Sequence, residues 1–134
     1  MKRLTSLLLL VLIGLPLSLT AAEYHVSVSG SDLKGTGAAD DPFASIQHAI
    51  ETAADGDTVW VEPGAYLENI DFSGKDLLVQ AIDGPELTFV KPLDPTLPVV
   101  TFASGESRLC LLDGFSVLYT TDAPGILCDG ASPI

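Results

Sequence analysis

The chain has 134 residues, and its 18 acidic residues outnumber 6 basic ones to give a formal net charge of −12 at neutral pH. This length allows one ordinary domain at most. The negative charge repels nucleic-acid phosphates and anionic lipid, so neither is expected as a partner. It would suit cations such as Ca²⁺, although acidic residues also serve simply to keep an exported protein soluble.

The N-terminal segment has the pattern of a cleaved signal peptide. Lys2 and Arg3 provide a positive start, residues 7–19 are almost wholly apolar, and small residues precede Glu23. The apolar run of about thirteen residues is shorter than the roughly 20 that a membrane span needs. We therefore predict a signal peptide at 1–22 and a secreted, periplasmic or cell-surface protein that does not insert into the membrane. An uncleaved anchor is the alternative.

Residues 23–57 are predicted to form a strand, a loop and a short helix. The stretch 24–28 alternates apolar and polar residues like a strand, and a loop rich in Gly and Ser follows it. Apolar residues at 46, 49, 50 and 53 then share one face of a helix, with Ser45 at the N-cap position. Gly56 ends the helix, because it can adopt the left-handed conformation.

From residue 58 onward the pattern changes to short strands separated by turns, with no second helix. Typical signals of β-hairpins are weak, which leaves a solenoid of stacked coils as the alternative to a sandwich. Leu112 and Ile134 lie 22 residues apart, and each ends a similar short segment. This spacing is within the range of repeat architectures. The expected strands are 58–61, 69–72, 77–82, 87–90, 99–102, 109–119 and 125–128.

Several runs resemble a known family. They are PFASIQHAI at 42–50, GDTVWVEPGAY at 56–66, YHVSVSGSD at 24–32, LDGFSV at 112–117 and GILCDGASPI at 125–134. Together they resemble the opening segment of secreted right-handed parallel β-helix proteins of the pectin-lyase-like superfamily. The shared residues are architectural, so the resemblance indicates a fold more strongly than a function.

The resemblance implies an all-β, right-handed parallel β-helix in which 23–57 supply a strand, a loop and a capping helix. Residues 58–134 would form its first coils, about two to three of them. Val59 and Val61 would face the core and Trp60 would face outward, while Gly56 and Gly64 would allow tight turns and Tyr66 would pack at a corner.

The same comparison implies a chain that lacks a C-terminal cap. We therefore expect a solenoid with few coils that is truncated at its C-terminus. A complete small protein is the alternative, with its last strand edge covered by a partner or by self-association.

Candidate catalytic residues are sparse. Polysaccharide lyases on this fold use a basic residue and often Ca²⁺, and hydrolases on it use carboxylate pairs. Lys91 and Arg108 are the basic candidates, and each is expected to be a solvated surface residue. Asp113, Asp122 and Asp129 could approach one another and hold Ca²⁺, but their spacing fits turn residues better.

The remaining polar candidates are expected to be structural. Asp40 and Asp41 precede the helix and would stabilise its N-terminus. His25 and His48 have no neighbouring ligand at metal spacing, and an exposed side chain is expected for His48.

The two cysteines, Cys110 and Cys128, lie 18 residues apart in a predicted exported chain. Export permits a disulfide, but we expect two separate buried thiols and leave the disulfide open.

These observations assign no catalytic, cofactor-binding or metal-ligating residue. They favour a secreted or cell-envelope module that recognises carbohydrate, with polysaccharide as partner, or that has a structural role with self-association through the uncapped C-terminal edge. The alternative is the N-terminal fragment of a polysaccharide lyase or glycoside hydrolase whose catalytic coils lie beyond residue 134.

Overall fold

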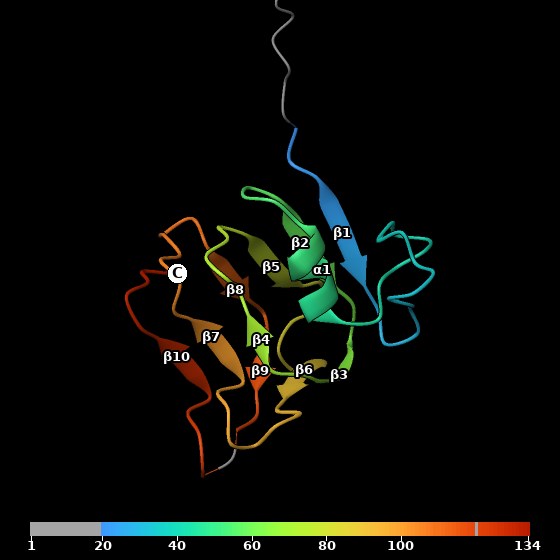
Figure 1. Ribbon diagram of the computed structural model, residues 1–134. Coiled ribbons are helices and arrows are strands. Elements are labelled where there is room, and N and C mark those ends of the chain that lie inside the picture. The colour runs from blue at the N-terminus through green and yellow to red at the C-terminus, as the bar shows by residue number, and fades with distance from the viewer. Residues whose placement is uncertain (1–19, 120) are drawn as a thin grey trace, which may run out of the picture.

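The computed structural model describes residues 20–119 and 121–134, which contain ten short strands and one helix (Figure 1). Residues 1–19, which hold most of the predicted signal peptide, lie outside the described part. The elements in chain order are β1 (Glu23–Val26), α1 (Ile46–Thr52), β2 (Thr58–Val61), β3 (Gly64–Leu67), β4 (Ile70–Asp71), β5 (Leu78–Ala81), β6 (Thr88–Lys91), β7 (Val100–Phe102), β8 (Leu111–Asp113), β9 (Ser116–Val117) and β10 (Ile126–Cys128).

The strands form three parallel sheets, with orders β1-β2-β5-β8, β10-β7-β4 and β3-β6-β9. Along the chain, β2, β3 and β4 lie one in each sheet, and the next six strands repeat that order twice. The parallel neighbours β1 and β2 are joined through the segment that contains α1. All later parallel neighbours are connected through the other two sheets, which explains how they occur without a crossover helix between them.

The predicted fold class, a right-handed parallel β-helix solenoid, is wrong. The described residues form ten short strands in three small parallel sheets, and these sheets are not curled into a solenoid. Successive residues in register across the first sheet are Glu23, Thr58, Leu78 and Leu111, so the steps along the chain are 35, 20 and 33 residues. Such uneven steps do not fit a repeat of about 22 residues, the spacing noted in the sequence, because irregular segments of different length separate the strands.

Most local predictions agree with the structure. The predicted helix is α1, and the Ser45 hydroxyl accepts a hydrogen bond from the His48 N–H, as an N-cap residue does. Gly56 has a positive φ of 88°, which L-residues rarely adopt, and it turns the chain after α1. Gly64 was expected in a turn, but it begins β3, where the Val28 side chain leaves no room for a Cβ.

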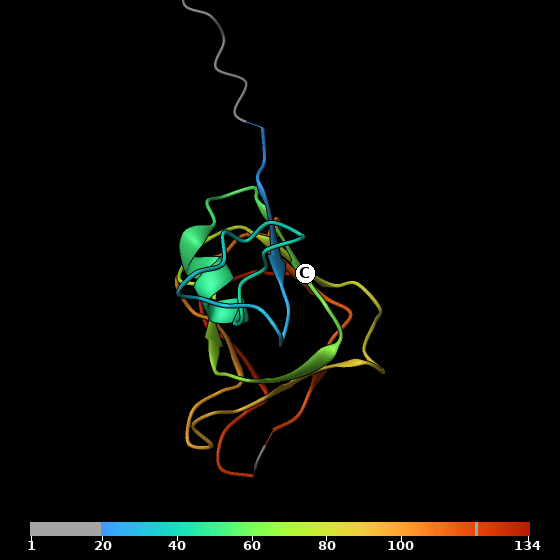
Figure 2. The ribbon, with the colours of Figure 1, turned by 90° about the vertical axis from the view of Figure 1, so that its right-hand side faces the viewer.

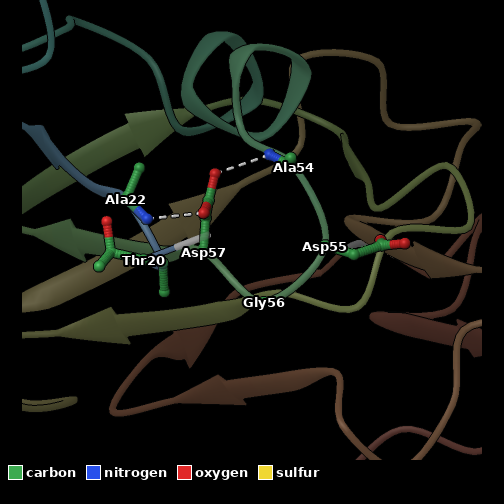
Figure 3. A pocket seen from close by; sticks show the side chains of 7 residues that line it. Thr20, Ala22, Ala54, Asp55, Gly56 and Asp57 are labelled. Carbon is green, nitrogen blue, oxygen red and sulfur yellow. Dashed lines mark hydrogen bonds between the residues drawn. The ribbon is translucent and has the colours of Figure 1, made fainter. Parts of the chain in front are cut away.

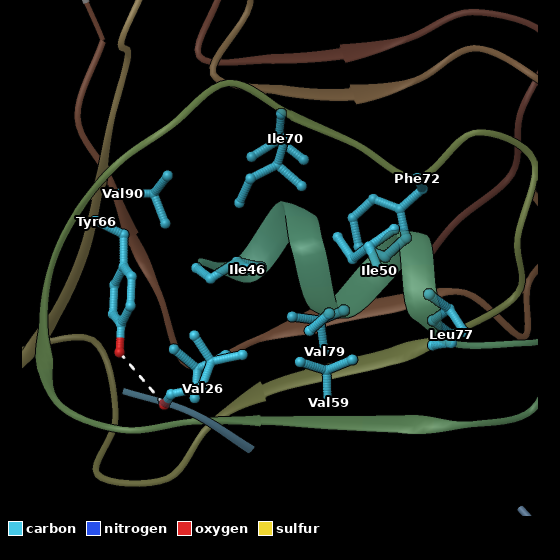
Figure 4. Close-up of a cluster of buried hydrophobic side chains, with 14 of the residues drawn as sticks. Val26, Ile46, Ile50, Val59, Tyr66, Ile70, Phe72, Leu77, Val79 and Val90 are labelled. Carbon is cyan, nitrogen blue, oxygen red and sulfur yellow. Dashed lines mark hydrogen bonds between the residues drawn. The ribbon is translucent and has the colours of Figure 1, made fainter. Parts of the chain in front are cut away.

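The core lies between the three sheets and α1 (Figure 4). Val59 and Val61 are fully buried while Trp60 between them is only half-buried, which confirms the expected alternation along β2. From α1, Ile46 and Ile50 project into the same cluster. Its other fully buried large side chains are Val26, Ile70, Phe72, Leu77, Val79, Val90, Val99 and Val100.

Side chains from the segments between the strands hold both ends of α1, which packs on one side of the molecule (Figure 2). The Glu68 carboxylate accepts hydrogen bonds from the Ile46 and Gln47 N–H groups at 2.9 and 2.8 Å. At the other end, the Lys75 ammonium donates to three backbone carbonyls at 2.7–2.8 Å, the favourable place for a cation. These contacts fix the helix against the sheets although it has only seven residues.

The pKa values of two acidic residues near the start of α1 are shifted in opposite directions. Burial raises the pKa of Glu68 despite its two backbone donors. Burial also opposes ionisation of Asp32, but hydrogen bonds from Ser45 and Ala44 outweigh it and lower the pKa of Asp32. Asp40 and Asp41 do not stabilise the N-terminus of α1 as expected. Both are exposed, and Asp41 Oδ2 instead accepts a hydrogen bond from the Thr36 N–H, in the loop before the helix.

Candidate functional site

One register position of the sheet β1-β2-β5-β8 carries a polar or aromatic residue on every strand. Trp60 on β2 pairs with His25 on β1 and with Gln80 on β5, and Gln80 pairs with Asp113 on β8. Since side chains alternate along each strand and the residues flanking Trp60 are buried, these four lie on the outer face of the sheet. We call His25, Trp60, Gln80 and Asp113 the polar row.

The polar row offers unused hydrogen-bonding groups. Its one internal contact joins Gln80 Nε2 to Asp113 Oδ2 at 3.4 Å, which is long. Within residues 20–119 and 121–134, the Trp60 indole N–H and the His25 imidazole form no hydrogen bond with the protein. His25, Trp60 and Gln80 are half-buried and Asp113 is exposed, so all four reach solvent.

The row is long enough for an extended ligand. Neighbouring strands lie about 4.8 Å apart, so four residues in register extend over about 14 Å. The parallel register row beside it consists of Glu23, Thr58, Leu78 and Leu111. The surface is therefore a shallow platform formed by regular strands, which are more rigid than loops.

The chemistry of the polar row suits binding better than catalysis. An indole offers an apolar face, an amide both donates and accepts, and a carboxylate accepts. Asp113 is the only carboxylate in the row, whereas glycoside hydrolysis commonly uses two that flank the bond to be broken.

The acidic residues considered for Ca²⁺ lie on different parts of the fold. Asp113 ends β8 in one sheet, Asp129 follows β10 in another, and Asp122 lies in the connection between β9 and β10. Within the described ranges no group of three or more His, Cys, Asp or Glu side chains could hold a metal ion.

The two basic candidates also lie apart from the polar row. Arg108 is exposed in the segment between β7 and β8, and Lys91 is the exposed last residue of β6, in a different sheet. No described contact brings either residue to Trp60.

The other histidine and the cysteines have structural surroundings. The His48 ring packs edge-on against Phe43 with ring centroids 4.6 Å apart, and it is half-buried rather than exposed as expected. Cys110 and Cys128 form no disulfide; Cys110 is buried and Cys128 is exposed, so the expectation of two buried thiols is wrong for Cys128. Burial raises the pKa of the Cys110 thiol to about 11, which leaves it unreactive at neutral pH.

A small pocket lies where the chain leaves α1 and enters β2 (Figure 3). Its one inward carboxylate, Asp57, already accepts hydrogen bonds from the Ala22 and Ala54 N–H groups at 2.7 and 2.8 Å. Its remaining lining residues are Thr20, Ala21, Asp55 and Gly56. Thr20, Ala21 and Ala22 line the pocket and belong to the predicted signal peptide, 1–22. Cleavage after Ala22 would therefore open the pocket.

Sequence reasoning identified Trp60 as outward-facing but missed the row that it belongs to. Alternation on β2 and β5 was a usable signal for Trp60 and Gln80 separately. Their alignment with His25 and Asp113 depends on strand register, which the uneven 35-, 20- and 33-residue steps hide.

Comparison of the chain with protein-family models, with curated proteins and with solved structures gives no match. The resemblance to pectin-lyase-like proteins therefore remains a prediction from the residues quoted for it. Among the described residues, no helix is both long and apolar enough to cross a membrane.

Proposed function

We propose that this chain is an exported carbohydrate-recognition module that binds through the outer face of the sheet β1-β2-β5-β8. The observation that carries the proposal is the register of the polar row, which aligns Trp60 with His25, Gln80 and Asp113. The export part of the proposal rests on the signal-peptide pattern of residues 1–22.

The row combines the two kinds of contact that sugars require. A sugar ring has an apolar C–H face that stacks on an indole, and hydroxyl groups that need both donors and acceptors. Gln80 supplies both, Asp113 accepts, and His25 can do either according to its tautomer. Because these groups have few partners within the protein, binding sugar hydroxyls would break only one long hydrogen bond.

The charge of this face indicates which sugars would bind. Glu23, Glu62 and Asp113 lie on or next to its strands, and His25 is the only residue on it that can become positive. Like charges repel uronate-rich polymers, so the preferred ligand is a neutral or amine-bearing oligosaccharide. This preference differs from the uronate substrates associated with many lyases of the resembled family.

Trp60 is the only tryptophan in the chain, so its fluorescence reports on this face alone. Titration with neutral and amine-bearing oligosaccharides should give a saturable change in emission, and polygalacturonate should give a smaller one at equal sugar concentration. The Asp122→Asn variant, which removes one exposed charge in the β9–β10 connection, should give the same change in emission and serves as the control. No spectral change with any neutral or amine-bearing glycan would refute the proposal.

A structural role is the second candidate, favoured by the exposure of β10. All three of its residues are exposed, and β10 is an edge strand of its sheet. Unpaired edge strands can pair with another chain, which supports self-association at the C-terminal edge. The enzyme alternative, a polysaccharide lyase or hydrolase with catalytic residues beyond 134, is supported by the family resemblance alone.

A further inference from the structure

The outer face of the sheet β3-β6-β9 is unusually apolar for an exposed surface. Along β6, Thr88 and Val90 are buried, so Phe89 and Lys91 lie on the outer face, and exposed Leu87 precedes them in the same alternation. Leu67 on β3 is 58% exposed, Leu87 is 54% exposed and Leu118, directly after β9, is 42% exposed. We call Ala65, Leu67, Leu87, Phe89, Lys91 and Leu118 the apolar face. Half-buried Ser116 on β9 is in register with Phe89, and its hydroxyl is taken up by a hydrogen bond that it donates to the Pro85 carbonyl.

Strand register makes these residues contiguous. Ala65 pairs with Phe89, and Leu67 pairs with Lys91. On the other side of β6, the Leu118 N–H donates to the Val90 carbonyl, which places Leu118 beside Lys91. A single cation thus lies between two exposed leucines, next to an aromatic ring. Clustered exposed apolar side chains of this kind commonly mark an interaction surface.

Lys91 is the one charged residue of the apolar face. Outside residues 1–22 the chain has four basic residues, and one of them, Lys75, already caps α1. In the described part of the chain, no carboxylate lies within ion-pair distance of the Lys91 ammonium. Beyond the opposite end of the stripe, exposed Glu86 lies in the turn directly before Leu87. The stripe is therefore apolar between Lys91 at one end and the turn that carries Glu86 beyond the other.

We propose that the apolar face binds the same face of a second copy of this chain across a two-fold axis near Phe89. Two-fold symmetry reverses the direction of the partner's β6, so Lys91 of each copy would meet the partner's Glu86. The leucines of the two copies would pack against one another, as the inner faces of two stacked sheets do. The stripe is thus complementary to itself in both charge and hydrophobicity.

This arrangement leaves the other surfaces free. The polar row lies on a different sheet, so both copies could bind sugar at the same time. The edge strand β10 also belongs to another sheet, which makes this interface distinct from self-association at the C-terminal edge. A membrane is the less suitable occupant, because the net charge of −12 repels anionic lipid.

Charge exchange tests the proposal without disturbing the core, because Glu86 and Lys91 are both exposed. Sedimentation equilibrium of the exported chain should show a dimer. Lys91→Glu and Glu86→Lys should each raise the dimer Kd at least about tenfold, because each variant places like charges together. The double variant E86K/K91E restores opposite charges and should return the Kd to within about threefold of the wild type.

Two further variants distinguish the surfaces. Arg108→Glu makes the same charge change as Lys91→Glu at an exposed position between β7 and β8, and it should leave the Kd unchanged. Leu127→Asp on β10 should also leave it unchanged. Circular dichroism and thermal melting of every variant confirm that it is folded.

Three results would overturn the proposal. A wild-type chain that is monomeric at its highest soluble concentration has no such interface. A dimer that survives both single reversals, or that is lost in Leu127→Asp, uses another surface. The third result is a wild-type chain that forms no dimer but sediments with zwitterionic lipid vesicles, while Leu67→Asp does not sediment with them. This result would assign the apolar face to a membrane instead.

Discussion

Two outer sheet faces of this molecule follow the same structural rules but carry opposite chemistry. Both belong to parallel sheets whose strands alternate buried and outward residues. The sheet β1-β2-β5-β8 presents His25, Trp60, Gln80 and Asp113 in register. The sheet β3-β6-β9 presents leucines, a phenylalanine, an alanine, one serine and one lysine.

The comparison separates the residues that fold the chain from those available for function. Inward residues on both sheets are mostly apolar, with Thr88 as a polar exception, because they must exclude water from one shared core. Outward residues are free of that requirement, so they can differ between the two faces without loss of the core. We infer sugar recognition for the polar row and self-association for the apolar face. The predictions below test this division, from the largest expected effect to the smallest.

The largest effect should come from the core that both faces share. Phe72 is fully buried and stacks on Phe102 with ring centroids 4.4 Å apart. Phe72→Ala should lower the free energy of unfolding by about 3–5 kcal/mol, because it removes apolar contacts and leaves a cavity. Phe89→Ala, on the half-buried outer side of β6, should cost about 1 kcal/mol or less. Urea denaturation measures both, and equal losses would show that Phe89 belongs to the core.

Trp60→Ala should separate the two faces functionally. The loss of stacking should weaken oligosaccharide binding about tenfold, equivalent to about 1.4 kcal/mol. Trp60→Phe, which keeps an aromatic ring, should weaken it less. Both variants should dimerise like the wild type, because Trp60 lies outside the apolar face. Isothermal titration calorimetry and sedimentation measure the two properties, and a joint loss of both would contradict the division.

Smaller effects are expected from the polar ends of the row. Gln80→Ala or Asp113→Asn should weaken sugar binding about two- to fivefold, since an exposed hydrogen bond contributes roughly 0.5–1 kcal/mol. Asp113→Asn should also improve relative binding of polygalacturonate, because it removes a repelling charge. Asp122→Asn, which removes the same charge in the β9–β10 connection, is the matched control. An identical response to both substitutions would assign the effect to net charge alone.

Sequence reasoning predicted the local elements of this fold better than their assembly. The spacing of Ile46 and Ile50 and the Ser45 cap predicted α1, because helix periodicity and capping act within a few residues. The strand β3 was missed, because the Pro63-Gly64 pair that precedes and begins it is typical of a turn. The overall fold class was wrong, since sheet arrangement depends on connections whose lengths follow no constant repeat.

The candidate site was predictable only in part for the same reason. The alternation of Val59, Trp60 and Val61 was enough to place Trp60 outside. The alignment of His25 and Asp113 with it is a long-range property, since the two residues are 88 positions apart in the sequence. Contacts between distant residues leave no periodic signal in a single sequence when the steps between paired strands differ in length, as they do here.

The most direct test of the central claim is chemical-shift mapping of the ¹⁵N-labelled exported chain with a neutral oligosaccharide. We predict saturable shifts at His25, the Trp60 indole N–H, the Gln80 side-chain amide and Asp113, with the amides of the apolar face unchanged. Shifts concentrated at Leu67, Phe89 and Leu118 instead, or none at the Trp60 indole, would contradict the assignment of sugar recognition to the polar row.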